Sequence, residues 1–521
     1  MTKLIRVFKL FLIVPFLITS CKNQDENIQK IGPRGILYKG FETIVEEPAV
    51  LSESEKKNKE VAERFDKEGL LYSAKVVEDR DEKMLIPPGY IEQFAGKEFT
   101  IAKTPPIIEF GLVPVKPKFF AAPPEGYHAG PWSNWSQANY YVPTGKFYTS
   151  VGDHGQYDAH LYIVEYDPAT KTIKTSSEIN RVLGRKPTEF QEGKIHGWMD
   201  FYPRNSPNLW FCTYWTQYPE PKEKDYATGY QGGHIMSYNV ETGDITDYGV
   251  PMIRASWPYH RIDIERGMLY AVGMFGEFLA WDIKEQKTHW AGYLPEGMDW
   301  WERGILIDEE TGMVYTSNRN KLDTTKHMIK YDPFKNRFFK LDCHMPKNKV
   351  PIKRGIEGGY NHMRAQTAHR EHDGLFWVIT YTGELFTFNP ENEEIVEKGI
   401  NWPGGQRYTC SMARSPEGKY IYYLPGAHGK SFMDGSPVIQ YNTETDEKKV
   451  LAFLYPYYNE KYGYTTGGSS TIKLDDKGER LFIQMNGAFI DVEEQMKQEI
   501  IDVFGHTSIF LIHIPESERI E

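Results

Sequence analysis

The stretch LYIVEYDPATKTI, residues 161–173, decides the fold because the chain repeats its pattern. Alternating apolar residues form a short strand, a polar turn follows, and a second short strand begins, which is typical of a β-hairpin. A truncated copy, SIFLIHIPES, occupies residues 508–517. The full copies between them are HIMSYNVETGDI (234–245), EFLAWDIKEQKTH (277–289), HMIKYDPFKNRFF (327–339), ELFTFNPENEEIV (384–396) and PVIQYNTETDEKKV (437–450).

Another apolar strand precedes each copy, and a further strand ending in a turn precedes that one. Four antiparallel strands repeated seven times predict an all-β fold, a seven-bladed β-propeller with an N-terminal extension. A β-sandwich also uses many short strands, but it does not repeat one ordered strand–turn pattern seven times. The preceding strands are KFYTSVG (146–152), LWFCTYW (209–215), MLYAVGM (268–274), MVYTSNR (313–319), LFWVITY (375–381), YIYYLPG (420–426) and LFIQMNG (481–487).

The last repeat ends after its third strand, so the seventh blade needs a strand from elsewhere. IIEFGLVPV, residues 107–115, is the best strand-like segment upstream of the first blade. We predict that it completes blade seven, because an unpaired edge would otherwise remain open. Residues 52–78 are charged with a helical pattern and are expected to pack outside the ring. The expected domains are a leader (1–20), a partly helical extension (21–106) and the propeller (107–521).

The N-terminus has the pattern of an export signal. Lys3 and Arg6 precede an apolar run, residues 8–18, which is too short to span a bilayer. Small residues then lead to Cys21, as in the lipobox of bacterial lipoproteins. The expectation is an exported protein held to a bacterial membrane, the outer one, by a lipid on Cys21; an ordinary signal peptide with a chance cysteine is the alternative.

Composition restricts the partners. The net charge of −11 argues against nucleic acid, although a local basic patch can still attract an acidic substrate. The aromatic content of 14% suits β-structure and surfaces that stack on sugar rings. Beyond Cys21 the chain has only Cys212, Cys343 and Cys410, too few for a disulfide framework in a chain of this size. A monomer is expected.

Aligning the repeats places chemically active side chains at one mouth of the central channel. The first strand of a blade begins on the face where the second strand ends. A lone histidine at a strand end is more often structural, but several at equivalent positions indicate a site. The first strands begin near Trp135, His196, His260, Glu302, His362, Cys410 and Ser470, and the second strands end near His154, Tyr214, Met274, Arg319, Tyr381, His428 and Asn486.

This alignment predicts two sets of binding residues, one for a metal ion and one for a substrate. His260, His362, Cys410 and His428 offer three imidazoles and a thiolate, a set suited to structural zinc. Basic and aromatic residues near the same mouth are expected to bind an acidic polysaccharide, with Arg303 and Arg364 adding to the positive charge. The predicted substrate contacts are Trp135, His196, Arg254, Tyr259 and Arg261.

A family resemblance falls on the same residues. GYHAGPWSNW (126–135), SVGDHG (150–155), GKIHGWMDFYP (193–203) and the tyrosine of FCTYW (211–215) resemble the propeller-fold ulvan lyases of polysaccharide lyase families 24 and 25. The resemblance implies β-elimination at a uronic acid, with a histidine pair and a tyrosine transferring protons and no redox cofactor. By motif these are His128, His154 and Tyr214. The arginine that neutralises the uronate carboxylate in those families has no clear counterpart; Arg254 and Arg261 are the candidates.

Other function classes remain open from the sequence. A glycoside hydrolase needs two carboxylates flanking the bond, and the aligned mouth offers only Glu302. A metal-dependent lyase of the oligogalacturonate type would use the same scaffold. A sugar-binding lipoprotein without catalytic activity is the third possibility.

Overall fold

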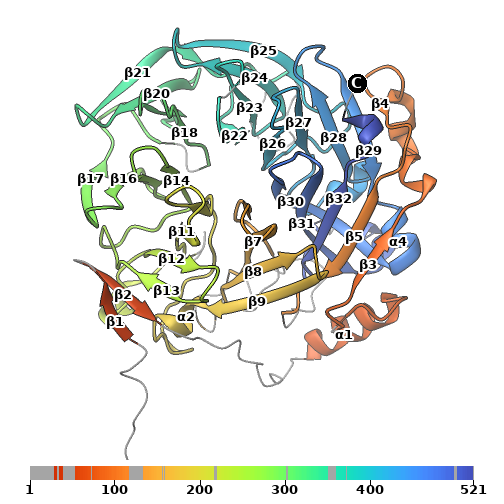
Figure 1. Ribbon diagram of the computed structural model, residues 1–521, viewed down its shortest axis with the longest axis horizontal. Helices are drawn as coiled ribbons and strands as arrows, with labels where there is room; N and C mark the ends of the chain where they lie inside the picture. The colour runs from red at the N-terminus through yellow and green to blue at the C-terminus, as the bar shows by residue number, and fades with distance from the viewer. Residues whose placement is uncertain are drawn as a thin grey trace, which may run out of the picture.

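Seven antiparallel sheets form a ring around a central channel in the computed structural model (Figure 1). The structure describes residues 28–31, 34–38, 53–71, 73–115, 133–154, 157, 159–215, 220–300, 303–349, 360–370, 372–497 and 502–519. Sheets follow one another around the ring in chain order, so each is one blade. The predicted seven-bladed propeller and its all-β class are confirmed.

Blades one to six each contain four strands in sequential order, the first lining the channel. Blade one contains β6 (Asn139–Tyr141), β7 (Lys146–Val151), β8 (Tyr162–Asp167) and β9 (Thr172–Glu178). Blade two contains β10 (Asp200–Phe201), β11 (Asn208–Cys212), β12 (Ile235–Asn239) and β13 (Ile245–Asp247). Blade three contains β14 (Tyr259–Asp263), β15 (Met268–Val272), β16 (Glu277–Asp282) and β17 (Lys287–Tyr293). Blade four contains β18 (Leu306–Ile307), β19 (Val314–Ser317), β20 (His327–Asp332) and β21 (Arg337–His344). Blade five contains β22 (Met363–Gln366), β23 (Phe376–Thr380), β24 (Glu384–Asn389) and β25 (Glu394–Ile400). Blade six contains β26 (Met412–Arg414), β27 (Tyr420–Tyr423), β28 (Pro437–Asn442) and β29 (Lys448–Phe453).

Blade seven closes the ring with strands from distant parts of the chain. Its strands are β30 (Tyr464–Leu474), β31 (Arg480–Phe489), β32 (Ser508–His513) and β5 (Ile107–Leu112). β5 pairs antiparallel with β32, with Gly111 opposite Ile509. Phe110 on β5 is fully buried and its ring packs against Phe510 and Tyr458, each at a centroid distance of 4.8 Å. The predicted closing strand is therefore confirmed.

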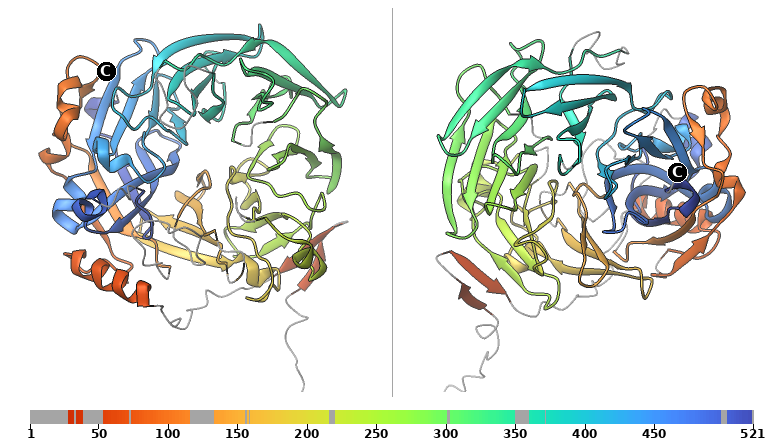
Figure 2. Two further views of the ribbon diagram at one scale, coloured as in Figure 1. Left: turned by 180° about the vertical axis from the view of Figure 1, so that it is seen from behind. Right: turned by 45° about the horizontal axis from the view of Figure 1, so that its top comes forward.

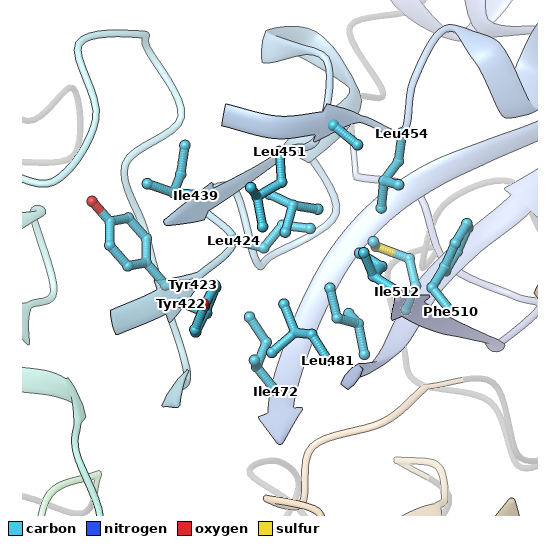
Figure 3. Packing of buried hydrophobic residues seen from close by; sticks show 14 of the residues in the cluster. Tyr422, Tyr423, Leu424, Ile439, Leu451, Leu454, Ile472, Leu481, Phe510 and Ile512 are labelled. Atoms are coloured by element: carbon cyan, nitrogen blue, oxygen red, sulfur yellow. The ribbon is translucent and has the colours of Figure 1, made fainter. Parts of the chain in front are cut away.

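The burial pattern shows why the repeats form blades. Every residue of β14 and β15 except Met268 is buried, because these strands are covered by neighbouring blades on both faces. The outermost strand β17 instead alternates between half-buried and exposed residues, since it faces solvent on one side. Apolar side chains from adjacent sheets fill the space between blades. Figure 3 shows this packing between blades six and seven, where the cluster includes Tyr422, Tyr423, Leu424, Ile439, Leu451, Leu454, Ile472, Leu481, Phe510 and Ile512.

Segments of the N-terminal extension add strands to the outside of three blades. β2 (Gly35–Tyr38) pairs with β13, and β1 (Ile28–Ile31) pairs with β2. β3 (Val76–Asp79) pairs with β5, and β4 (Thr100–Ile101) lies parallel to β29. Figure 2 shows that the part of the extension that contains β3 and β4 runs along the outer side of the last two blades. The extension thus covers blade edges that would otherwise expose unpaired backbone groups.

Short helices occupy the outside and the connections. The expected helical character of residues 52–78 is correct only for α1 (Glu53–Phe65), because residues 76–79 pair as a strand. None of the helices in the described part of the chain is long and apolar enough to cross a membrane. The others are η2 (Glu82–Leu85), η3 (Gly89–Phe94), α2 (Ile179–Val182), α3 (Glu223–Ala227), η4 (Ser431–Asp434), α4 (Tyr457–Tyr462), α5 (Val492–Lys497) and η5 (Glu516–Glu518).

Candidate active site

The first mouth of the channel is the end where the first strands begin and the second strands end. In blade two, the residues just outside β10 and β11 continue the pairing beyond the regular strands. Lys194 N donates to Tyr214 O at 3.0 Å, and Tyr214 N donates to Lys194 O at 2.9 Å. This bridge fixes Lys194 beside Tyr214, and His196, two residues further along, approaches the same ring.

Lys194 is at the centre of an aromatic and imidazole cluster. Its Nζ lies 2.9 Å from His154 Nε2, to which it donates. The same ammonium lies 4.2 Å from the ring centroid of Trp135 and 5.1 Å from that of Tyr214. The rings of Trp135 and His154 are themselves 4.8 Å apart. One buried lysine thus joins residues from blades one and two.

A second group surrounds His196. Its ring is perpendicular to that of Tyr214, with centroids 5.9 Å apart. Arg303, in the segment before β18 of blade four, hydrogen-bonds the His196 imidazole. Tyr214 itself is fully buried, and its hydroxyl donates to Met274 Sδ at 2.9 Å.

Blades five and six contribute another cation. Arg364, on β22, is buried, and its Nε donates to Tyr408 Oη at 2.6 Å. Its Nη2 donates to Cys410 Sγ at 2.7 Å. His428 lies next to this group, with its ring 6.2 Å from that of Tyr408.

Electrostatics keep the histidines of this mouth neutral. Burial lowers the pKa of His154 and of His196 well below the usual range. The positive charges of Lys194 and Arg303 lower both pKa values further. Burial, together with the same two charges, also lowers the pKa of His428. Arg303 thus affects the pKa of histidines from blades one, two and six. The result is a basic mouth that contains uncharged imidazoles.

Four of the sequence-predicted residues meet here. His154, Tyr214, His196 and Trp135 form one connected cluster with Lys194. His128, the proposed partner of His154, lies outside the described residues, as do Glu302 and the proposed lipidation site Cys21.

The two arginines expected to bind a carboxylate are placed elsewhere. Arg254 forms a two-pronged ion pair with Glu223 of α3, at 2.6 and 2.7 Å, where both side chains are exposed. Arg261 is buried inside the channel, where its guanidinium stacks on Trp198 and donates to the carbonyl oxygen of Ala368. At the first mouth, the structure instead places Arg303 next to His196 and Lys194 next to His154.

Two other predicted site residues, both on the inner strand β14, also lie in surroundings that differ from the expected ones. Tyr259 was expected at the substrate surface, but its buried hydroxyl accepts a hydrogen bond from Trp198 Nε1 at 2.6 Å inside the channel. His260 points between blades, where its Nε2 accepts the backbone N–H of Cys212 at 3.1 Å. Gly197 allows this placement, because a Cβ there would collide with the His260 ring.

The predicted zinc ligands do not gather in the structure. In the part of the chain that is described, no three His, Cys, Asp or Glu side chains are placed to hold a metal, and His260, His362, Cys410 and His428 form no such group. Cys410 instead accepts a hydrogen bond from Arg364. Zinc binding by these residues stays a prediction, which elemental analysis of the purified protein tests.

Lys194 and Tyr408 were missed by the sequence analysis. Lys194 stands two residues before His196 in GKIHG, and in extended backbone this spacing puts both side chains on one face. That periodicity was the available signal. Tyr408 precedes the aligned Cys410 by the same interval.

We expect acid to destabilise the protein through its buried histidines. Burial lowers the pKa of His260 from 6.5 to about 3. Between these pH values the unfolded chain binds a proton that the folded chain does not. The free energy of unfolding therefore decreases as the pH is lowered, by up to about 1.4 kcal/mol per pH unit for this residue. Urea unfolding at pH 7 and pH 5 measures the slope. His260→Gln should make it shallower, and an unchanged slope would contradict the assignment.

Sequence comparisons leave the family open. No model of a known protein family matches the chain, and no curated protein matches it. Among solved structures, 1503 chains match. One is Raptor from Chaetomium thermophilum, with a TM-score of 0.42 and 10% identity, covering 74% of this chain and 29% of Raptor. The chain therefore spans less than a third of that protein's length.

Proposed function

We propose that the first mouth binds a uronic-acid-containing polysaccharide and cleaves it by β-elimination. The observation that carries the proposal is the convergence of neutral His154 and His196 with Lys194, Arg303 and Tyr214. An acidic sugar needs cations to neutralise its carboxylate, and elimination needs an uncharged base to take the proton beside that carboxylate. The resemblance to ulvan lyases supports the same chemistry.

Each residue then has a distinct task. The guanidinium of Arg303 binds the uronate carboxylate and stabilises the charge that develops on it when the adjacent carbon loses its proton. The carboxylate also attracts the Lys194 ammonium away from His154 Nε2, which frees that nitrogen to accept the proton. The electron pair of the broken C–H bond forms the C=C bond as the glycosidic C–O bond breaks. Tyr214 donates a proton to the leaving sugar oxygen.

A second candidate is binding without cleavage. The Tyr214 hydroxyl is fully buried against Met274 Sδ, and it has to turn toward the channel to reach a leaving oxygen. If it stays there, the same basic and aromatic mouth holds an acidic glycan without transferring a proton. This candidate shares the ligand with the lyase and differs only in turnover.

Two measurements on one panel separate these candidates. Polyuronates, including sulfated ones, are incubated with the protein, and ultraviolet absorbance reports the unsaturated ends that elimination creates. Calorimetric titration with the same polymers reports binding. Absorbance growth supports the lyase, binding without growth supports the second candidate, and neither signal would reject both.

The acid limb of the pH–rate profile should lie well below pH 6.5. The proposed base must be neutral, and burial together with Lys194 holds the pKa of His154 well below its usual value of 6.5. The rate should therefore persist as pH falls through 6.5. Lys194→Met removes the nearest positive charge, so it should move the limb toward higher pH, as well as weaken substrate binding. Initial rates between pH 4 and pH 8 test both statements, and a limb already at 6.5 in the wild type would oppose the assignment.

A further inference from the structure

The opposite end of the channel contains a cavity of about 240 Å³. It opens on the face where the first strands end, so we call it the second mouth. Residues at or just beyond the ends of β6, β22, β26 and β30 line it, which places contributions from blades one, five, six and seven around one hollow. Its wall includes Val142, His369, Met412, Ala413, Ile472 and Lys473.

Hydrogen bonds inside the ring join the inner strands of different blades. Gln137 of blade one donates to the carbonyl oxygen of Ser470 in blade seven. Deeper in, Tyr259 of blade three accepts hydrogen bonds from both Trp198 and Gln366, the latter from blade five. Trp198 also forms part of the cavity wall.

Lys473, on β30, is the cation available to a ligand in this cavity. Its side chain lines the cavity, and its Nζ forms no hydrogen bond or ion pair with any residue that the structure describes. Burial lowers its pKa, the charge of Arg261 lowers it further, and Asp200 raises it. An ammonium held in these surroundings gains from an anionic partner, because its solvation by water is incomplete.

The other charged groups around the cavity have protein partners. Arg414 pairs with Asp373 at 2.6 Å, His369 with Glu309 at 3.0 Å, and Asp475 with Arg480 at 2.8 Å. Asp476, which is exposed, and His372 complete the titratable lining together with Tyr140. The carboxylates near Lys473 therefore favour a ligand with one negative charge over one with two.

We propose that the second mouth binds a small monocarboxylate whose body is about one ring in size. The carboxylate accepts hydrogen bonds from Lys473 Nζ, and the ring lies against Trp198 and the apolar wall made by Met412, Ala413 and Ile472. The cavity is smaller than the roughly 300–1,000 Å³ of pockets for drug-sized ligands, which limits the occupant to a single ring. This site is independent of the elimination chemistry proposed for the first mouth.

Titration calorimetry with two probes, glucuronate and cyclohexanecarboxylate, tests the site. At least one acid should bind the wild-type protein, while its methyl ester should bind roughly tenfold or more weakly because the charge-assisted hydrogen bond is lost. Inorganic phosphate, which carries more charge, should bind less well than the acid. No binding of either acid, equal binding of acid and ester, or tighter binding of phosphate would overturn the proposal.

Variants locate the binding. For cyclohexanecarboxylate, the probe that is not a uronate, Lys473→Met should abolish binding, with Lys473→Gln as a second replacement if the first folds poorly. Lys477→Met, at an exposed position of the following turn, is the matched control and should leave affinity unchanged. Lys194→Met alters the first mouth and should also leave it unchanged. If Lys194→Met abolishes binding and Lys473→Met does not, the acid occupies the first mouth and the second site is refuted, whatever the outcome of the lyase assay.

Discussion

His154→Ala should reduce the rate of polyuronate cleavage by roughly 10²–10⁴-fold, the usual contribution of a general base. His154 Nε2 accepts a hydrogen bond from Lys194 at 2.9 Å, and the ring contacts Trp135. Removing the imidazole leaves Lys194 and Arg303 in place, so the variant should still bind the acidic polymer. Initial rates from ultraviolet absorbance and affinities from calorimetry measure the two effects separately.

The control is His289→Ala, on the outer strand β17, where the imidazole contacts the carbonyl oxygen of Pro333 rather than the channel. It should retain the wild-type rate. Circular dichroism and thermal unfolding establish that both variants are folded. A folded His154→Ala protein with near-normal turnover would remove this histidine from the mechanism.

Removing the closing strand should prevent stable folding. A chain that begins at residue 116 lacks β5, so β32 is left with an unpaired edge, and the aromatic cluster around Phe110 loses its centre. Deleting one buried phenylalanine typically costs about 3–5 kcal/mol, compared with about 5–15 kcal/mol for the stability of a whole domain. Soluble yield and cooperativity of thermal unfolding measure the effect.

The matched deletion starts the chain at residue 53 instead. It removes β1 and β2, which pair only outside β13 of blade two, and keeps β3, β4 and β5. This protein should fold cooperatively with a modest loss of stability. If the chain starting at residue 116 unfolds as cooperatively as the chain starting at residue 53, β5 does not hold the ring closed.

The fold could be predicted because its information is local and repeated. Alternation and turn residues mark each hairpin, and the missing fourth strand of the last repeat pointed to residues 107–115. The strands β3 and β4 could not be predicted in this way. Each is short, and its partner lies far along the chain, so only the assembled edge of the ring shows where it pairs.

The site was only partly predictable because side-chain direction depends on register. Alignment correctly brought His154, Tyr214 and His196 to one mouth. On β14, however, consecutive side chains point to opposite sides, so His260 faces blade two while Tyr259 and Arg261 point away from it, toward the channel. The position of Arg303 depends on how blade four is oriented relative to blade two, which no local pattern specifies.

The most direct test of the proposed elimination compares an ulvan-type polyuronate with the same polymer after its carboxyl groups have been reduced to alcohols. The wild-type protein should produce a growing ultraviolet absorbance from the native polymer and none from the reduced one, because Arg303 and Lys194 then have no carboxylate to bind and the proton to be removed is no longer acidic. Absence of any absorbance change with native polyuronates, or cleavage of both polymers at the same rate, would contradict the proposed function.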